Sequence, residues 1–539
     1  MSYQSAVWTP LNVIKKKVYP LFGGGYIDNC SNYDLLPNWS PYLRNARFDW
    51  IDLVIRPWHI LHASLTAGST PKGIGSYLRS VPANDVLVVR HNQSAGHKLV
   101  TITAAGSITS IDTWVLITSD NRMNFINSGD NVYCMNGVDK IGKLAWTTYS
   151  NPVSGTIGSA ITPAFGVVFN SSLFVSGWWT NPNIVYKSVW NNFEDYDSTG
   201  SDKFNFEEPI TGLATTNQAL FYFTKNSVAV TATSDIVTTS GAVSYSNRAL
   251  KVVEGAFNNE CIVAVGNNVY YLNSAIQIDQ IATGQNINGF EVKSLSQRPM
   301  AWCSKLLDSL DRDQTGSYGE YVAWPSLIKR HLKTNWASYP DIVLVYDTVK
   351  DKFLVDNNKY FFGWVDFHQY HYSISAVEPK VFKDEYGTDD DDSAIPFEFW
   401  SKEFYVTDAT LKKVIWELRT LMDINELAVI TQEVWLDWVL KDTKVIDKNS
   451  LPQLAVWGIW VNAVGTDPVG EDWINEDNSV IDDDYQELVI LRTKGNLNYR
   501  FKKMQFRRYT STKAAKLRLK TITAKTEQLD FLTTPLTPN

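Results

Sequence analysis

The middle of the chain repeats one pattern of apolar and polar positions. A run of β-branched and aromatic residues meets a short turn of Asn, Ser, Gly or Asp, and a second run of the same kind follows. Run length and turn chemistry are those of a β-hairpin. The clearest examples span residues 125–135, 166–175, 219–230, 261–272 and 342–355.

The spacing of these hairpins is close to regular. Their tips lie at Gly129, Ser171, Asn226, Asn267 and Val349, so successive tips are 42, 55, 41 and 82 residues apart. The last gap is nearly twice 41 and holds another candidate pair, Met300–Cys303 and Tyr318–Trp324. A period of about 40–45 residues is that of a four-stranded propeller blade. We predict a β-propeller of five to seven blades over residues 61–395, with a large β-sandwich as the structural alternative.

The pattern changes after the acidic run Asp389–Asp392. Residues 397–406 alternate apolar and polar positions, as a half-buried strand does. Further strands are expected at 413–419, 434–439, 455–461, 499–506 and 516–522. The fold class is therefore all-β: a β-propeller followed by a β-sandwich-like C-terminal domain at 396–539, with residues 1–60 closing or bracing the fold.

Composition agrees with a large β protein. Trp, Tyr and Phe make up 13% of the 539 residues, and aromatic residues favour strands. No stretch has the apolar length of a transmembrane helix, and the first residues do not form a secretory signal. The four cysteines show no metal or disulfide spacing, which indicates reduced thiols in a protein made in a reducing cytoplasm.

Charge is unevenly distributed behind a net value of −8. Residues 467–487 contain nine acidic residues and no basic one. This acidic insertion is either a surface loop or the wall of a passage that repels a polyanion and keeps it from sticking. The residues that would line such a channel are Asp467, Glu471, Asp472, Glu476, Asp477, Asp482, Asp483 and Asp484.

The basic counterpart follows at residues 492–525, with twelve Lys or Arg and no acid. Lys516, Arg518 and Lys520 alternate with leucines, so a strand places the three cations on one face. That face is either ordinarily solvated or an interface with an acidic neighbour, such as the 400–490 region of the next copy.

Catalytic and metal-binding motifs are missing. The chain has no phosphate-binding loop, dinucleotide fingerprint or zinc-protease motif. His368 and His371 are three residues apart, a spacing that does not converge on a metal in a strand or loop, so we expect a structural role. The Asp389–Asp392 run lacks the spacing of a calcium loop and indicates a solvated turn. We expect no catalytic residue, no cofactor and no metal.

Four tryptophans suggest one further possibility. Trp178, Trp179, Trp457 and Trp460 offer rings that can stack on sugars, although β-rich domains bury most tryptophans in cores or subunit interfaces.

Three N-terminal sequence motifs resemble those of a known family. They are residues 23–27 (Gly-Gly-Gly-Tyr-Ile), residues 36–48 with Leu-Pro, Ser-Pro and Asn-Ala-Arg, and residues 55–57 (Ile-Arg-Pro). This opening resembles that of the tail nozzle proteins of short-tailed phages, also called tail tubular protein B or tail hub. Residues 190–196 and the closing strands look like later parts of the same proteins. The glycine that usually follows Arg-Pro is absent here, where Trp58 and His59 stand.

The resemblance implies a structural virion protein rather than an enzyme. In that family a homo-hexameric ring sits below the portal and the adaptor (head-to-tail connector), with a β-propeller in each subunit. An axial channel retains the genome and lets double-stranded DNA pass non-specifically during ejection, and a tail fibre or spike docks on the side. We expect the same partners, no membrane segment and a place in the virion tail. The alternative is a carbohydrate-binding or glycan-cleaving propeller protein for receptor recognition.

Overall fold

The fold is described from a computed structural model. It covers residues 15–19, 25–26, 39–40, 42–49, 52–57, 59–93, 96–111, 117–239, 242–250, 254–283, 290–295, 310–311, 314, 317–323, 326–335, 337–357, 359–386, 393–401, 413–424, 428–447, 487–494, 504–513, 515 and 517–528. These residues contain β-strands and three short 3-10 helices and no α-helix. The chain divides into two compact units, residues 59–387 and residues 1–58 with 388–539.

The described part of residues 59–387 holds seven antiparallel four-stranded sheets, which we number as blades in chain order. Blades one to three are β8 (Thr70–Tyr77), β9 (Val86–Gln93), β10 (Gly96–Thr103), β11 (Ile108–Ile111); β12 (Asn124–Ser128), β13 (Asn131–Met135), β14 (Gly142–Ala145), β15 (Thr148–Ser150); and β16 (Phe165–Phe169), β17 (Ser172–Ser176), β18 (Ile184–Lys187), β19 (Asp202–Asn205). Blades four and five are β20 (Ile210–Thr215), β21 (Ala219–Thr224), β22 (Val228–Ala232), β25 (Arg248–Ala249); and β26 (Ile262–Val265), β27 (Asn268–Leu272), β28 (Ile278–Thr283), β29 (Phe290–Ser294). Blades six and seven are β30 (Tyr318–Val322), β31 (Leu327–Leu332), β32 (Ile342–Asp347), β33 (Lys352–Asn357); and β34 (Phe361–Phe367), β35 (Tyr370–Ser375), β36 (Lys380–Asp384), β7 (Ile60–Ser64).

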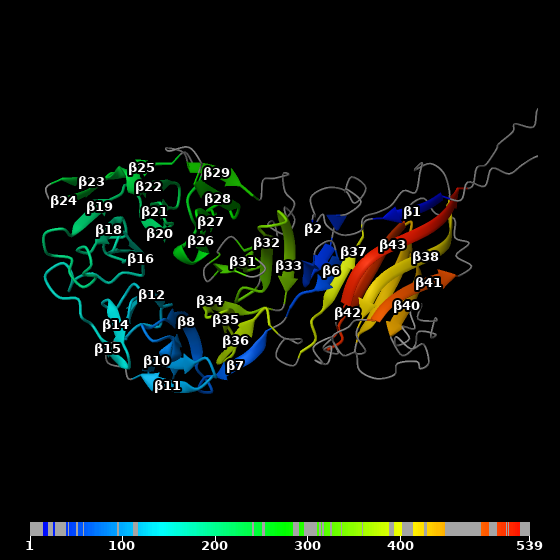
Figure 1. The fold of residues 1–539 in the computed structure, drawn as a ribbon, viewed down its shortest axis with the longest axis horizontal. Helices are drawn as coiled ribbons and strands as arrows, with labels where there is room; N and C mark the ends of the chain where they lie inside the picture. The colour runs from blue at the N-terminus through cyan, green and yellow to red at the C-terminus, as the bar shows by residue number, and fades with distance from the viewer. Residues whose placement is uncertain are drawn as a thin grey trace, which may run out of the picture. The chain divides into compact units, whose positions relative to one another are not determined.

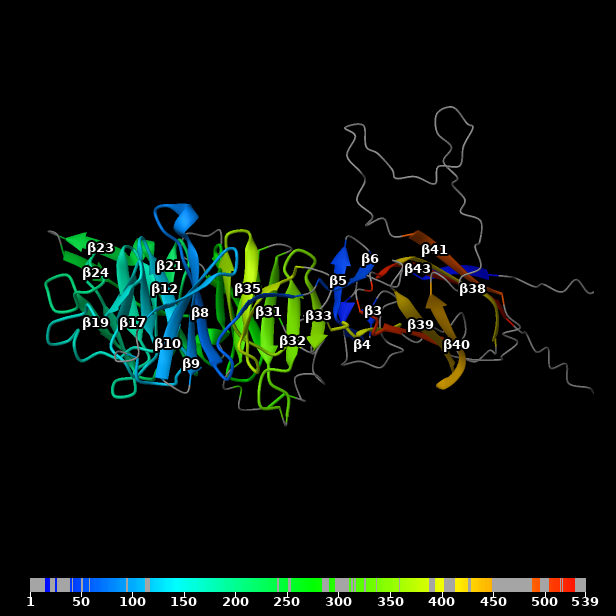
Figure 2. The same ribbon diagram turned by 90° about the horizontal axis from the view of Figure 1, so that it is seen from below.

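These sheets form a β-propeller. The first strands contact one another in a closed circle, β8 to β12, β16, β20, β26, β30, β34 and back to β8, so they form its inner ring. Figure 1 shows the sheets arranged around a common centre, and Figure 2 shows them from the side. The outermost strand of blade seven is β7, from the start of the unit, which pairs with β36 from its end. That pairing closes the circle between the two ends of the unit.

The core of the propeller lies between neighbouring blades. Alternate side chains of each sheet are apolar and pack against the next sheet, as a stacked sheet pair requires. Between blades one and two, for example, Val88 and Leu99 pack with Val132 and Leu144, all fully buried. The remaining small elements are η1 (Pro82–Asn84), η2 (Thr233–Asp235), η3 (Asn259–Cys261) and the hairpin β23 (Ile236–Thr239)–β24 (Ala242–Tyr245).

The second unit holds two larger sheets. One is ordered β41 (Glu487–Lys494), β38 (Lys413–Ile424), β43 (Leu517–Gln528), β6 (Asp52–Ile55), β5 (Ala46–Asp49), with β1 (Lys15–Tyr19) also on β43. The other is ordered β4 (Tyr42–Arg44), β37 (Phe397–Trp400), β42 (Met504–Thr510), β39 (Val429–Leu436), β40 (Val439–Asp447). A short parallel pair, β2 (Gly25–Tyr26) and β3 (Trp39–Ser40), completes it.

Each of the two sheets contributes buried apolar residues, such as Met422 and Leu519 from one and Phe399 and Phe506 from the other. This is a β-sandwich-like domain, and the propeller lies inside its sequence. N-terminal strands pair with C-terminal ones on both sheets, β4 with β37 and β6 with β43.

The five predicted hairpins are present as β12–β13, β16–β17, β21–β22, β26–β27 and β32–β33. They are not equivalent, however. Three join the first and second strands of a blade, β21–β22 joins the second and third, and β32–β33 joins the third and fourth. The separation of 82 residues therefore runs from the first hairpin of blade five to the last hairpin of blade six, so it does not measure two blade repeats.

Of the predicted pair Met300–Cys303 and Tyr318–Trp324, the second is present as β30 (Tyr318–Val322), which pairs with β31, whereas Met300–Cys303 lies outside the described residues. One predicted strand assignment is wrong. Residues 434–439 are not one strand, because Asp437 (φ 49°) and Trp438 (φ 68°) form a two-residue turn between β39 and β40. Two successive positive φ values are those of a type I′ hairpin turn, which follows the natural twist of the strands.

Candidate functional site

In the described part of the chain, a buried cluster of charged side chains lies between blades six and seven. Lys329 of β31 places its Nζ 2.6 Å from Asp384 Oδ2, 2.7 Å from Glu385 Oε1 and 3.2 Å from Glu320 Oε1. Lys359, just before β34, reaches Asp384 Oδ1 at 2.7 Å. At most 5% of any of these side chains is exposed. The cluster therefore joins the two blades through ion pairs that water does not reach.

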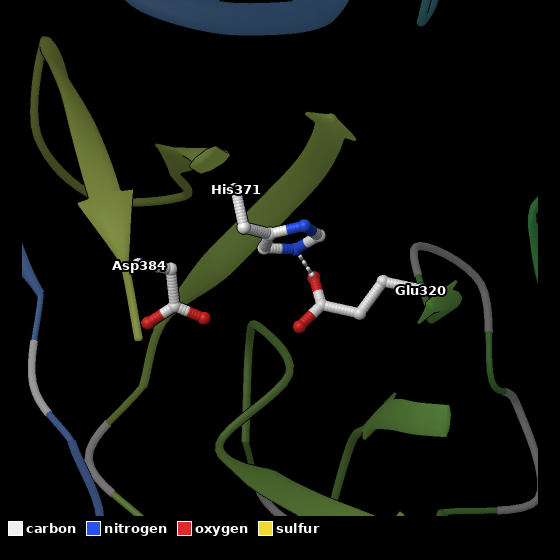
Figure 3. A group of neighbouring side chains, drawn as sticks. All are labelled: Glu320, His371 and Asp384. Atoms are coloured by element: carbon white, nitrogen blue, oxygen red, sulfur yellow. Dashed lines mark ion pairs between the residues drawn. The ribbon is translucent and has the colours of Figure 1, made fainter. Parts of the chain in front are cut away.

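Two histidines extend the cluster. His331 Nε2 lies 3.2 Å from Glu320 Oε1, and its ring stacks on Tyr318 with 4.2 Å between centroids. His371 Nε2 lies 3.3 Å from Glu320 Oε2, the pair drawn in Figure 3, and its Nδ1 lies 2.7 Å from Asp366 Oδ1. One carboxylate thus contacts two imidazoles and a lysine.

The carboxyl groups are held ionised. Burial alone raises the pKa of Glu320, but the charge of Lys329 and the two imidazoles of His331 and His371 outweigh burial and hold that pKa well below its usual value. The same balance of burial against Lys329 and Lys359 keeps the pKa of Asp384 well below its usual value.

The two imidazoles behave differently. Burial lowers the pKa of both, and for His331 the net shift stays downward in spite of Glu320, so its ring is neutral near pH 7. For His371, Glu320 and Asp366 together overcome burial and raise the pKa to about 9. With His371 protonated, two lysines and one histidine face the buried carboxyl groups of Glu320, Asp384 and Glu385, and the partly exposed Asp366 is a fourth carboxylate at the edge of the cluster.

Glu320, His371 and Asp384 also form a group whose ligand atoms lie within 4.8 Å of one another (Figure 3). Spacing of this kind can hold a metal ion. Here the ammonium group of Lys329 already contacts two of the three residues together with Glu385. The lysine occupies the cation position, so the arrangement fits an internal ion network better than a metal site.

The local sequence of β31 explains how the network is built. Its six residues, Leu-Ile-Lys-Arg-His-Leu, are all buried, and alternation places Lys329 and His331 on one face and Arg330 on the other. The strand register sets Glu320 directly opposite Lys329. On the other face Arg330 Nη1 donates to the carbonyl of Cys261 at 2.7 Å, which ties blade six to blade five. A Cβ on Gly319 would lie 1.8 Å from Arg330 Nη1, so a larger residue here would displace the buried guanidinium.

Of the histidine pair singled out in the sequence, only His371 belongs to the network. His368 is at the β34–β35 turn with φ 55°, and its side chain is 41% exposed. Sequence reasoning missed the other members. A signal was present, because β31 has three consecutive basic residues between apolar ones, and the strand before it contains Glu320. This pattern predicts a buried cross-strand ion pair once the β30–β31 hairpin is recognised.

The acidic channel residues from Asp467 to Asp484 lie outside the described residues, as do Asp389–Asp392, Trp457 and Trp460. Of the basic face, Lys516 lies outside them too, and the side chain of Lys520 is not described. Arg518 lies on β43 between Asp423 of β38 and Val54 of β6 and is half-buried.

The two adjacent tryptophans separate. Trp178 is buried and stacks on Tyr186 with 4.8 Å between centroids, whereas Trp179 is 92% exposed. Trp178 thus serves the core of blade three, and only Trp179 is open to a ligand.

The residues that carry the family resemblance meet in the sandwich unit. Asn45, fully buried with φ 53°, accepts a hydrogen bond from Arg56 Nε at its Oδ1 (3.1 Å) and donates through Nδ2 to the carbonyl of Pro396 (2.7 Å). Ser40 Oγ donates to the carbonyl of Trp400 at 2.7 Å. The N-terminal motif is therefore a buried joint between the segments that precede and follow the propeller in the sequence.

No protein-family model and no curated protein matches this chain. Solved structures similar to it include YCF48 bound to a D1 peptide, 10% identical over 63% of this chain and 96% of that one, with a TM-score of 0.38. The WD40 β-propeller domain of Doa1 is 8% identical over 61% and 96%, with a TM-score of 0.37. PorZ, a surface component of the type-IX secretion system of Porphyromonas gingivalis, is 10% identical over 72% and 46%, with a TM-score of 0.37. We take from them nothing beyond the fold.

Helices of the length and apolarity needed to cross a bilayer do not occur in the described part of the chain.

Proposed function

We propose that this chain is the tail nozzle subunit of a short-tailed phage. Six copies form a ring below the portal and adaptor, and an axial channel retains the genome and conducts DNA at ejection. The observation that carries the proposal is the buried joint of Asn45 and Arg56 with the carbonyl of Pro396. These contacts explain why the fold needs the Asn-x-Arg and Arg-Pro motifs, on which the family resemblance depends.

The architecture suits such a role. A propeller closed by pairing of its two ends is rigid, and the ion network adds links between blades six and seven. A sandwich that includes both chain ends leaves the propeller as one insertion, able to serve as a lateral module. In this proposal the acidic segment 467–487 lines the channel, where like charge keeps DNA from adhering.

Native mass spectrometry of the full chain mixed with the adaptor ring of the same virus tests the proposal. At micromolar concentration we expect a hexamer bound to the adaptor. Only monomer under these conditions would contradict it. A ring contact is heterologous and must close on itself, so partial oligomers should be minor.

The basic face gives a second test of the same proposal. Reversing Lys516, Arg518 and Lys520 to Glu should weaken assembly of the ring or its binding to the adaptor. The matched control is reversal of Lys140, Lys203 and Lys225, three propeller lysines, with assembly unchanged. If the two triple variants assemble equally well, the basic face is not an interface.

A further inference from the structure

A cavity of about 510 Å³ opens where the inner strands of blades three, four and five end. Its size falls in the roughly 300–1,000 Å³ range of small-ligand sites. Its walls come from the ends of β16, β20 and β26 and from the start of η2. The lining residues are Val168, Phe169, Asn170, Thr215, Thr216, Asn217, Thr233, Ala264 and Gly266.

The lining is polar and carries no charged side chain. It presents three threonine hydroxyls and two asparagine amides beside the apolar groups of Val168, Phe169 and Ala264. The side chains of Thr215, Asn217 and Thr233 form no hydrogen bond with the described residues. These groups can both donate and accept hydrogen bonds and are open to a ligand.

The backbone of the cavity is held in place. Thr233 N donates to the carbonyl of Gln218 at 2.8 Å, and Thr216 N donates to the carbonyl of Ala219 at 2.9 Å. Asn170 and Ser171 both have positive φ, so the β16–β17 turn is a rigid two-residue hairpin. Because the site is already ordered, binding a ligand does not require the entropic cost of ordering the loops.

An exposed aromatic ring adjoins this turn. Asn191 N donates to the carbonyl of Ser171 at 2.7 Å, which holds the bend containing Trp190 against the β16–β17 tip. Trp190 is 59% exposed, and it follows β18 at the same edge of the blade as Asn170. Trp178 and Trp179 follow β17 and belong to the opposite edge. Trp190 is therefore the exposed tryptophan at the edge of blade three that carries the β16–β17 turn.

From these observations we propose that the cavity binds a neutral carbohydrate. Hydroxyl and amide groups match the alternating donors and acceptors of a sugar, and an exposed indole offers a face for its C–H groups. A charged ligand would lose hydration here without a compensating charge on the walls. The site is a glycan contact of the propeller and is independent of ring formation.

The test uses the full chain on an array of neutral and acidic oligosaccharides, followed by calorimetric titration of the strongest neutral glycan. We expect binding to a neutral glycan, with at least a tenfold weaker affinity for Thr215→Val, Asn217→Ala and Trp190→Ala. Melting temperatures equal to that of the wild type would verify that the three variants keep the fold.

The control is Trp179→Ala, a more exposed tryptophan at the opposite edge of the same blade; the affinity of this variant should equal that of the wild type. Loss of binding in this variant alone would move the site to Trp179 and overturn the proposal. So would binding to acidic glycans only, unchanged affinity in the three cavity variants, or no glycan bound at all.

Discussion

The two units of the chain each contain a group of carboxylates around a cation, in different surroundings. In the propeller, Lys329 is enclosed by three carboxylates with almost no exposed surface. In the sandwich, Arg507 of β42 lies between Glu398 of β37 and Glu433 of β39, at 2.7 and 3.3 Å. The Arg507 side chain keeps 28% of its surface exposed.

The sandwich group uses aromatic rings where the propeller uses further charges. Arg507 lies over the rings of Trp400 and Tyr509, at 5.1 and 4.4 Å from their centroids. Trp400 Nε1 donates to Glu398 Oε1 at 2.7 Å, which orients the carboxylate. Because water screens the ions in the sandwich, each ion pair there contributes little to the free energy of unfolding. In the propeller, an ion left without its partner would stay buried and unsolvated, which costs much more. The same pairing chemistry therefore has different consequences in the two units.

The largest expected effect follows from removing one charge of the buried network. Asp384→Asn keeps the shape of the side chain but leaves Lys329 and Lys359 without their shared carboxylate. We expect the free energy of unfolding to fall by about 3–5 kcal/mol, the usual cost of breaking a buried ion pair. Urea denaturation followed by fluorescence measures it, and a loss below about 1 kcal/mol would show that the network is not desolvated.

The next effect is a dependence on pH above neutrality. The pKa of His371 is raised to about 9 against an ordinary 6.5, so its contribution is complete below pH 6.5 and is lost as pH rises to 9. We expect up to about 3 kcal/mol of stability to disappear across that window. His371→Gln should be less stable at pH 6 and nearly flat from pH 6.5 to 9. Parallel curves for the two proteins would assign the titration to another group.

A smaller effect is expected in the sandwich. Arg507→Lys keeps the charge but removes the planar group that bridges two carboxylates and stacks on two rings. Because the site is partly solvated, the loss should be about 1 kcal/mol. If Arg507→Lys lowered the free energy of unfolding as much as Asp384→Asn does, the ion pairs of the two units would not differ in their contribution to stability.

The smallest effect serves as the exposed reference. Glu378 pairs with Lys380 at 2.8 Å, with 51% and 28% of the two side chains exposed. Glu378→Gln should change the free energy of unfolding by less than about 0.5 kcal/mol. A larger change at moderate salt would mean that the pair is more than a surface contact.

Hairpins with short polar turns could be predicted from the sequence because their signal is local. Asn170 and Ser171 are turn residues between two apolar runs, and the structure has β16 and β17 on either side. The Asp437–Trp438 turn was missed because tryptophan rarely takes a positive φ, so the apolar run around it indicated one continuous strand.

The ion network could not be predicted because its members come from two blades. Glu320 and Lys329 are cross-strand neighbours within one hairpin, but Asp384 lies 55 residues from Lys329. Only the packing of blade seven against blade six brings them together. The same holds for Asn45 and Pro396, which the sequence places 351 residues apart.

A projection image of the purified full chain in negative stain tests the proposed function most directly. We expect closed rings with six-fold symmetry around a central opening, with the propeller of each subunit as a lateral feature. Single particles of one chain, or open filaments without a closed ring, would contradict it.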